Sequence, residues 1–226
     1  MVLSLRVWPL LVACLWICRA SALAEDSAEA RAILDAAGIS AGLCVQVGCG
    51  SPTALAEASY ALGLALESSD DSAAAALLTQ AAAVAADAGN RWIQAFAQTE
   101  VLWLEARQGS PRTALAGFSD VIDLWFRGGD WANQWLSLRH VFGILVQLHD
   151  HRAAATLHGA LTAVGAAYAL PFEASDAEHI TELVGMLRDR LGAAEFAAAV
   201  RHGASMSDGE IVDFTQARIA ALTGFP

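Results

Sequence analysis

The chain has 226 residues, a formal net charge of −11 at pH 7 and a hydrophobic content of 56%. Recognition of a phosphate backbone needs clustered positive charge, so this acidic balance argues against direct binding of nucleic acid. Lysine is absent and the arginines form no basic patch. The length suits one elongated domain or a short array of repeats.

Residues 1–24 fit two interpretations. Arg6, the apolar run Val7–Cys18 and the small residues ending at Ala24 are typical of a cleaved secretory signal. The same segment, followed by an acidic turn near Asp26, also fits the first helix of a repeat. We expect that helix and a cytoplasmic protein, with secretion after cleavage behind Ala24 as the alternative. The apolar residues are too interrupted for a stable membrane span.

The four cysteines do not decide between a cytoplasmic and a secreted protein. If a signal were cleaved, Cys44 and Cys49 would remain and could form one disulfide in an exported helical protein. If it were not, Cys14 and Cys18 are expected to be buried core thiols. The paired spacings and histidine partners of a zinc site are absent, so no metal is expected.

The segment Gly48–Ser51 follows an apolar run and precedes a helix, as the glycine-rich loop of S-adenosylmethionine methyltransferases does. Thr53 replaces the third glycine, and Gln46 replaces the usual acid of the first strand. We interpret the segment as an irregular turn between repeats and expect no cofactor and no enzymatic activity. A methyltransferase is the alternative, and calorimetric titration with S-adenosylmethionine discriminates the two.

Helix-opening residues recur along the chain at a step of 39 or 40 residues. Ser, Asp and Asn are favoured there because their side-chain oxygens accept hydrogen bonds from unpaired N–H groups of the first turn, and proline suits the next position. One series is Ser51-Pro52, Asn90 and Asp130. The other series is Asp71, Ser110-Pro111 and Asp150. Two helices per forty residues predict an all-α fold, specifically an α-solenoid of tetratricopeptide-like helix pairs.

Small and apolar residues recur at the same interval of 39 or 40 residues. Four residues after each opening of the second series stands alanine, and eleven residues after it stands another apolar residue on the same helix face. These residues are Ala75, Ala114 and Ala154, then Ala82, Val121 and Leu161. We expect Ala114 to be buried against the helix that carries Trp103, and Ala106 to lie toward the solvent edge.

Helix is expected almost throughout. The expected helices span residues 3–22, 27–38, 52–68, 72–88, 91–108, 111–127, 131–148, 151–168, 176–191, 193–202 and 208–222. Residues 1–168 form the repeat array, with pairs near 3–38, 52–88, 91–127 and 131–168. Residues 169–226 form non-repeat capping helices, in which Ser175–Glu178 and Ser207–Glu210 match the capping-box pattern.

The second half of the chain resembles a known family. The motifs that carry the resemblance are Gly129-Asp130-Trp131, Trp135-Leu136, Leu148, Ala153–Ala155, His158-Gly159-Ala160, Leu191-Gly192, Phe196, Gly203 and Glu210-Ile211-Val212. They are similar to the C-terminal helical-repeat region of large actinobacterial transcriptional regulators, which join an ATPase to tetratricopeptide-like repeats and in some cases a LuxR-type helix-turn-helix. The resemblance implies a sensory or docking arm with a protein partner.

The family's other sites do not carry over to this sequence. The chain has no G-x-x-x-x-G-K-[ST] loop for ATP and no lysine to complete one. The resemblance likewise does not extend to the DNA-reading helix of those regulators, so we expect none here.

Several polar residues could belong to a metal-binding or catalytic site. His149-Asp150-His151 could hold a metal, but Asp150 is expected to open a helix, so we interpret the segment as an exposed turn. His158 is expected in the packed helix face. Asp120 and Asp123 are interpreted as a solvated helix edge rather than acid–base catalysts.

Tryptophans are the candidate partner-binding residues. Large aromatic side chains fill gaps between helices or act as anchors for a protein partner. We expect one or two of Trp92, Trp103, Trp131 and Trp135 to line a binding groove.

Overall fold

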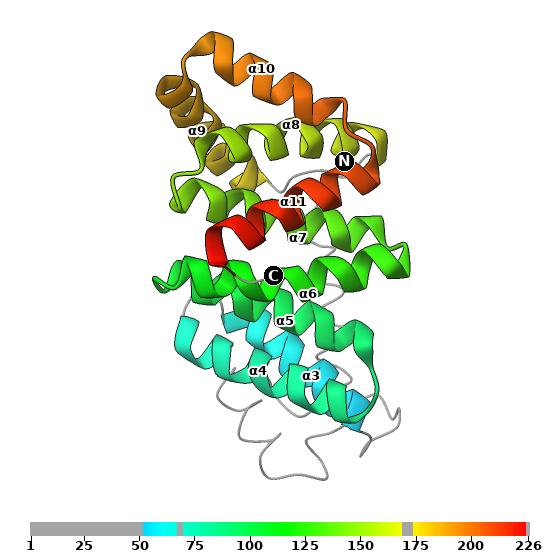
Figure 1. Cartoon of the computed structure of the whole chain (residues 1–226). Coiled ribbons are helices and arrows are strands. Elements are labelled where there is room, and N and C mark those ends of the chain that lie inside the picture. Colours follow the sequence, from blue (N-terminus) through cyan, green and yellow to red (C-terminus); the bar gives the residue numbers. More distant parts are fainter. Residues whose placement is uncertain (1–51, 67–69, 169–173, 225–226) are drawn as a thin grey trace, which may run out of the picture. The chain divides into compact units, whose positions relative to one another are not determined.

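The computed structural model describes residues 52–66, 70–168 and 174–224, and every element in these ranges is an α-helix (Figure 1). The all-α prediction is confirmed for this part of the chain. The expected helices 3–22 and 27–38, the cysteines and the loop Gly48–Ser51 lie outside the described residues. The chain divides into two compact units, residues 1–104 and 105–226. The expected change from repeats to capping helices after residue 168 stays a prediction.

The observed helices begin and end within two residues of the expected ones. They are α3 (Pro52–Leu66), α4 (Asp71–Asp87), α5 (Arg91–Arg107), α6 (Pro111–Gly128), α7 (Trp131–Gln147), α8 (His151–Tyr168), α9 (Ala174–Leu191), α10 (Ala193–Ala204) and α11 (Asp208–Thr223). Because α9 begins at Ala174, Ser175 lies inside the helix and does not precede it as a capping residue would. No described helix is both long and apolar enough to cross a membrane.

The same turn recurs every 20 residues. The residues that immediately precede helices α4 to α8 are Asp70, Asn90, Ser110, Asp130 and Asp150. The residue before the last four of them has a positive φ: 71° at Gly89, 103° at Gly109, 68° at Gly129 and 61° at His149. In all four turns the capping residue donates its N–H to the carbonyl five residues earlier, over 2.8 to 3.1 Å. The left-handed residue closes one helix and the polar residue opens the next.

The second series of openings needs a correction at its first member. Asp70, not Asp71, accepts hydrogen bonds from the N–H groups of Ser72 and Ala73, and Asp71 is the first helical residue. The expected positions Ala75 and Ala82 therefore move to Ala74 and Ala81. With this shift, the residues four and eleven positions after each opening are all buried, at 0 to 4% exposure: Ala74, Ala114, Ala154, Ala81, Val121 and Leu161.

Unit 1 holds α3 against α4, with α5 completing its core. Ala74, Leu78 and Leu104 form one buried cluster, and Ala56, Ala85 and Ile93 form another. Ala74, Leu78 and Ala85 stand four, seven or eleven positions apart in α4, so one stripe of that helix is covered. Burial of this stripe stabilises the unit by about 25 cal/mol for each Å² of apolar surface removed from water.

Unit 2 is built around α8. Helices α6, α7 and α8 pack in chain order, α9 and α10 pack on α8, and α11 packs on both α6 and α8. Figure 1 shows α11, in red, between α6 and α8. Ala114 is fully buried, as expected, but Ala106 is only 2% exposed, so its placement at a solvent edge is wrong. Ala106 lies on a second buried face of α5, together with Ala95 and Thr99, which stand eleven and seven positions earlier.

Candidate functional site

Trp92 is the most accessible of the four candidate tryptophans. It stands at the second position of α5 and is 48% exposed. Its ring meets the edge of Phe96 at a centroid distance of 4.2 Å, and Phe96 lies 5.9 Å from Tyr60 of α3. The three rings form a surface, here called the aromatic step, that holds the indole in place while leaving half of it accessible.

The other tryptophans are less accessible. Trp103 and Trp131 are partly buried, and Trp131 meets the ring of Phe126, which is 41% exposed. Trp135 is 4% exposed, and its indole N–H donates to the carbonyl of Leu161 at 3.1 Å. Trp135 therefore fills the contact between α7 and α8 and is not accessible to a partner in this structure.

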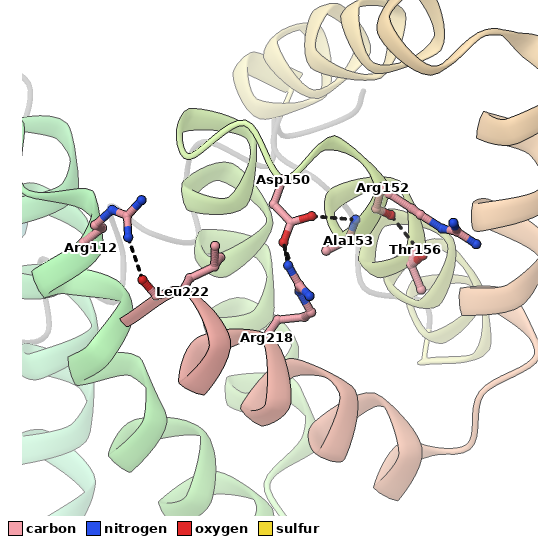
Figure 2. Close-up of polar contacts among 7 residues, drawn as sticks. All are labelled: Arg112, Asp150, Arg152, Ala153, Thr156, Arg218 and Leu222. Carbon is pink, nitrogen blue, oxygen red and sulfur yellow. Dashed lines mark hydrogen bonds and ion pairs between the residues drawn. The ribbon is translucent and has the colours of Figure 1, made fainter. Parts of the chain in front are cut away.

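The turn His149-Asp150-His151 has a structural role. The Asp150 carboxylate accepts the N–H of Ala153 at 3.4 Å and the Nε–H of Arg218 at 2.9 Å, as Figure 2 shows. His149 is exposed, and its ring lies 5.7 Å from that of His151. Among the described residues no group of three histidine, cysteine or carboxylate side chains could hold a metal ion.

His158 faces the packed side of α8, as expected. Its ring lies 5.8 Å from that of Phe142 on α7. Burial lowers the pKa of His158 below its ordinary value, because the charged imidazolium would lose hydration there. The partly buried packing of the ring therefore disfavours its charged form.

Asp120 and Asp123 both lie on α6. Asp120 is exposed. Asp123 forms an ion pair with Arg127 one turn later and accepts the amide N–H of Gln216 at 3.2 Å. Asp123 thus occupies a solvated helix edge, as expected, but it also contacts α11, which the sequence did not indicate.

A row of polar contacts holds α11 against α6 and α8, and we call it the α11 seam (Figure 2). Gln216 accepts the Ser119 hydroxyl at 2.8 Å and donates to the Ser119 carbonyl at 3.0 Å. Arg112 donates to the carbonyl of Leu222 at 2.8 Å, and Arg218 pairs with Asp150. Sequence reasoning missed this seam, because its partners lie 68 to 110 positions apart and share no motif.

The core of unit 2 contains one unusual polar side chain. Gln134, on the buried face of α7, is 0% exposed, and neither its amide oxygen nor its amide nitrogen has a hydrogen-bond partner. Burying an unpaired amide opposes folding, since its hydrogen bonds to water are not replaced.

Comparison with models of known protein families, with curated proteins and with solved structures finds no match to this chain.

Proposed function

We propose that this protein is a protein-interaction or regulatory module, an α-solenoid of tetratricopeptide-like helix pairs followed by capping helices. The 20-residue recurrence of one turn geometry supports this proposal, since a regular turn gives successive helices the same length and the same buried stripe. Such arrays expose extended surfaces on which a partner can lie.

We propose further that the protein acts in the cytoplasm. Its role there would be like that of the sensory or docking arm of an ATPase-type transcriptional regulator. The motifs between Gly129 and Val212 support this role by their similarity to the regulators' repeats. A native protein that begins at Glu25, as measured by mass spectrometry, would contradict the cytoplasmic location.

The aromatic step is the observation that carries the proposal. An indole that is 48% exposed leaves apolar surface in water, and burial of that surface by a partner is favourable. Tryptophan is also among the residues most enriched at the energetic centres of protein interfaces. The edge contact with Phe96 limits the movement of the ring, so less conformational entropy is lost on binding.

Site-specific photo-crosslinking tests the proposal. A photoreactive phenylalanine analogue replaces Trp92 in the full chain in its source organism, and the matched control carries it at Gln98, also exposed on α5. We expect one discrete crosslinked protein from position 92 and none from position 98. The purified partner should then bind the Trp92→Ala variant at least about tenfold more weakly than the wild type, a loss of about 1.4 kcal/mol. Equal affinity for both would contradict the proposal.

A further inference from the structure

Two glutamates stand beside the aromatic step on the helices that build it. Glu57 lies three residues before Tyr60 on α3, and Glu100 lies four residues after Phe96 on α5. Side chains three or four positions apart are neighbours on a helix surface, so each glutamate adjoins a ring of the step. Both glutamates are 8% exposed, and charges that are largely buried are screened less by salt than fully exposed ones. The aromatic step is therefore bordered by carboxylates on both of its helices.

The rest of unit 1 carries charge of the same sign. Its described residues include one guanidinium, that of Arg91. Their carboxylates belong to Glu57, Asp70, Asp71, Asp87 and Glu100. The summed field of such a surface attracts cations and repels acidic partners. Charge complementarity therefore favours a basic segment as the occupant of the aromatic step.

The indole of Trp92 offers a ring face to a cation. Its plane is inclined at 69° to that of Phe96, so the two rings are not stacked and Phe96 covers at most one face of the indole. The negative face of an aromatic ring attracts guanidinium and ammonium groups, and tryptophan attracts them most strongly. The chain makes this contact inside unit 2, where the guanidinium carbon of Arg139 lies 4.9 Å from the ring centre of Trp135. A second guanidinium from outside the chain would complete the same contact at Trp92.

We propose that the aromatic step receives an arginine side chain of the partner protein, which lies on the Trp92 indole and is attracted by Glu57 and Glu100. This inference rests on the proposed function and names the chemistry of the partner's contact. Arginine fits this surface better than lysine, because its planar guanidinium is weakly hydrated, stacks on aromatic rings and still donates to carboxylates. The partner's binding segment should therefore be basic, with an arginine at the centre of the contact.

The first experiment adds short peptides to the full wild-type chain. The probe is a capped tripeptide with arginine between two alanines. Its matched controls carry citrulline, which has the same shape without the charge, or leucine or proline in place of the arginine. NMR spectroscopy follows the indole N–H resonance of Trp92, assigned with the Trp92→Leu variant, and that of Trp131 as an internal control. We expect the arginine peptide to shift the Trp92 resonance alone and to bind at least fivefold more tightly than each control peptide.

Matched variants of the protein separate attraction by the ring from ordinary apolar contact. Trp92→Leu keeps an apolar side chain and removes the ring face, so the arginine peptide, followed through its own resonances, should bind at least fivefold more weakly. Glu57→Gln removes one charge at nearly constant shape and should weaken binding about twofold. Asp120→Asn, at an exposed position of α6, is the matched control and should leave binding unchanged.

Four results would overturn the inference: no shift of the Trp92 resonance, an equal shift at Trp131, equal binding of the arginine and citrulline peptides, or tighter binding of the leucine or proline peptide. The experiment on the wild-type chain needs no variant, so it stands if Glu57→Gln fails to fold. A discrete protein crosslinked at position 92, together with equal binding of the arginine and citrulline peptides, would leave the proposed function standing and remove only this inference. Arginine binding at Trp92 without any crosslinked protein would instead contradict the proposed function.

Discussion

Helices α10 and α11 both contact α8, and the atoms that make the two contacts differ. At the α10 contact the two backbones approach closely: a Cβ added to Gly203 would lie 1.8 Å from the Thr156 carbonyl oxygen, and one added to Gly159 would lie 2.1 Å from that of Val200. The α11 contact is made by side chains that reach across a partly hydrated seam. A backbone contact has no flexible group that can yield, whereas a side-chain contact can break and re-form. The packing of α10 on α8 therefore depends on the two glycines, whereas the packing of α11 depends on side-chain contacts.

The largest effect is expected when a methyl group is added where α8 and α10 touch. Gly203→Ala should lower the free energy of unfolding by about 3 kcal/mol, the upper end for overpacked cores, because the neighbouring atom is backbone. Gly185→Ala is the control: this exposed glycine of α9 has no atom within 4 Å, and alanine there should stabilise by about 0.5–1 kcal/mol. Equal free energies of unfolding for the two variants in denaturant melts would contradict the close approach of α8 and α10.

A second test extends the comparison to α6, the other helix under α11. Ala114→Leu inserts three carbons at a fully buried position and should cost about 2 kcal/mol. Ala132→Leu, at an exposed position of α7, is the matched control and should change stability little. Equal melting temperatures for the two variants would show that the buried stripe has been placed on the wrong helix face.

Gln134 contrasts with the α11 seam, because its polar atoms are buried and unpaired while those of the seam are paired. Gln134→Met keeps nearly the same volume and removes the unpaired amide, so it should stabilise the protein by about 1 kcal/mol. Gln216→Met, which removes a paired amide from the seam, should instead destabilise. Loss of stability in Gln134→Met would indicate that a water or another group satisfies the amide.

The turn that starts α8 offers a smaller test. His149 holds φ 61°, where the three equivalent turns have glycine. His149→Gly should stabilise by about 0.5–1 kcal/mol, since a non-glycine residue is strained in the left-handed region. Gly129→Ala, the reverse change in the preceding turn, should destabilise by a similar amount. Thermal melts in which both changes act in the same direction would contradict equivalence of the turns.

The smallest expected effect is a pH dependence at His158. Its lowered pKa means that the folded protein disfavours the protonated ring, so stability is lost as the pH falls below the ordinary histidine value of 6.5 and the unfolded chain takes up the proton first. The free energy of unfolding should therefore fall more between about pH 7.5 and pH 5.5 in the wild type than in His158→Phe. Parallel pH profiles for the two proteins would show that His158 is not protected from water.

The sequence by itself determined the helices and their turns. Each turn depends on contacts within about five residues, such as the Asp130 carboxylate with the Asn133 N–H at 3.2 Å, and such contacts follow from local residue order. The one-residue error at Asp70 arose because two adjacent aspartates offer the same capping oxygen. The burial of Ala114 was also predictable, since helical periodicity fixes which face is covered.

Only the tertiary structure decided which surfaces are available. Trp92, at the second position of α5, is 48% exposed, whereas Trp135, at the fifth position of α7, is 4% exposed. The docking of α11 joins Arg112 to Leu222, 110 residues apart, and no local pattern encodes such a pairing. Alanine-rich helices have apolar stripes that match many neighbours, so the choice among them depends on the close approach allowed at Gly159 and Gly203 and on the hydrogen bonds of Gln216 and Arg218. These close approaches and hydrogen bonds exist only once the helices have been brought together.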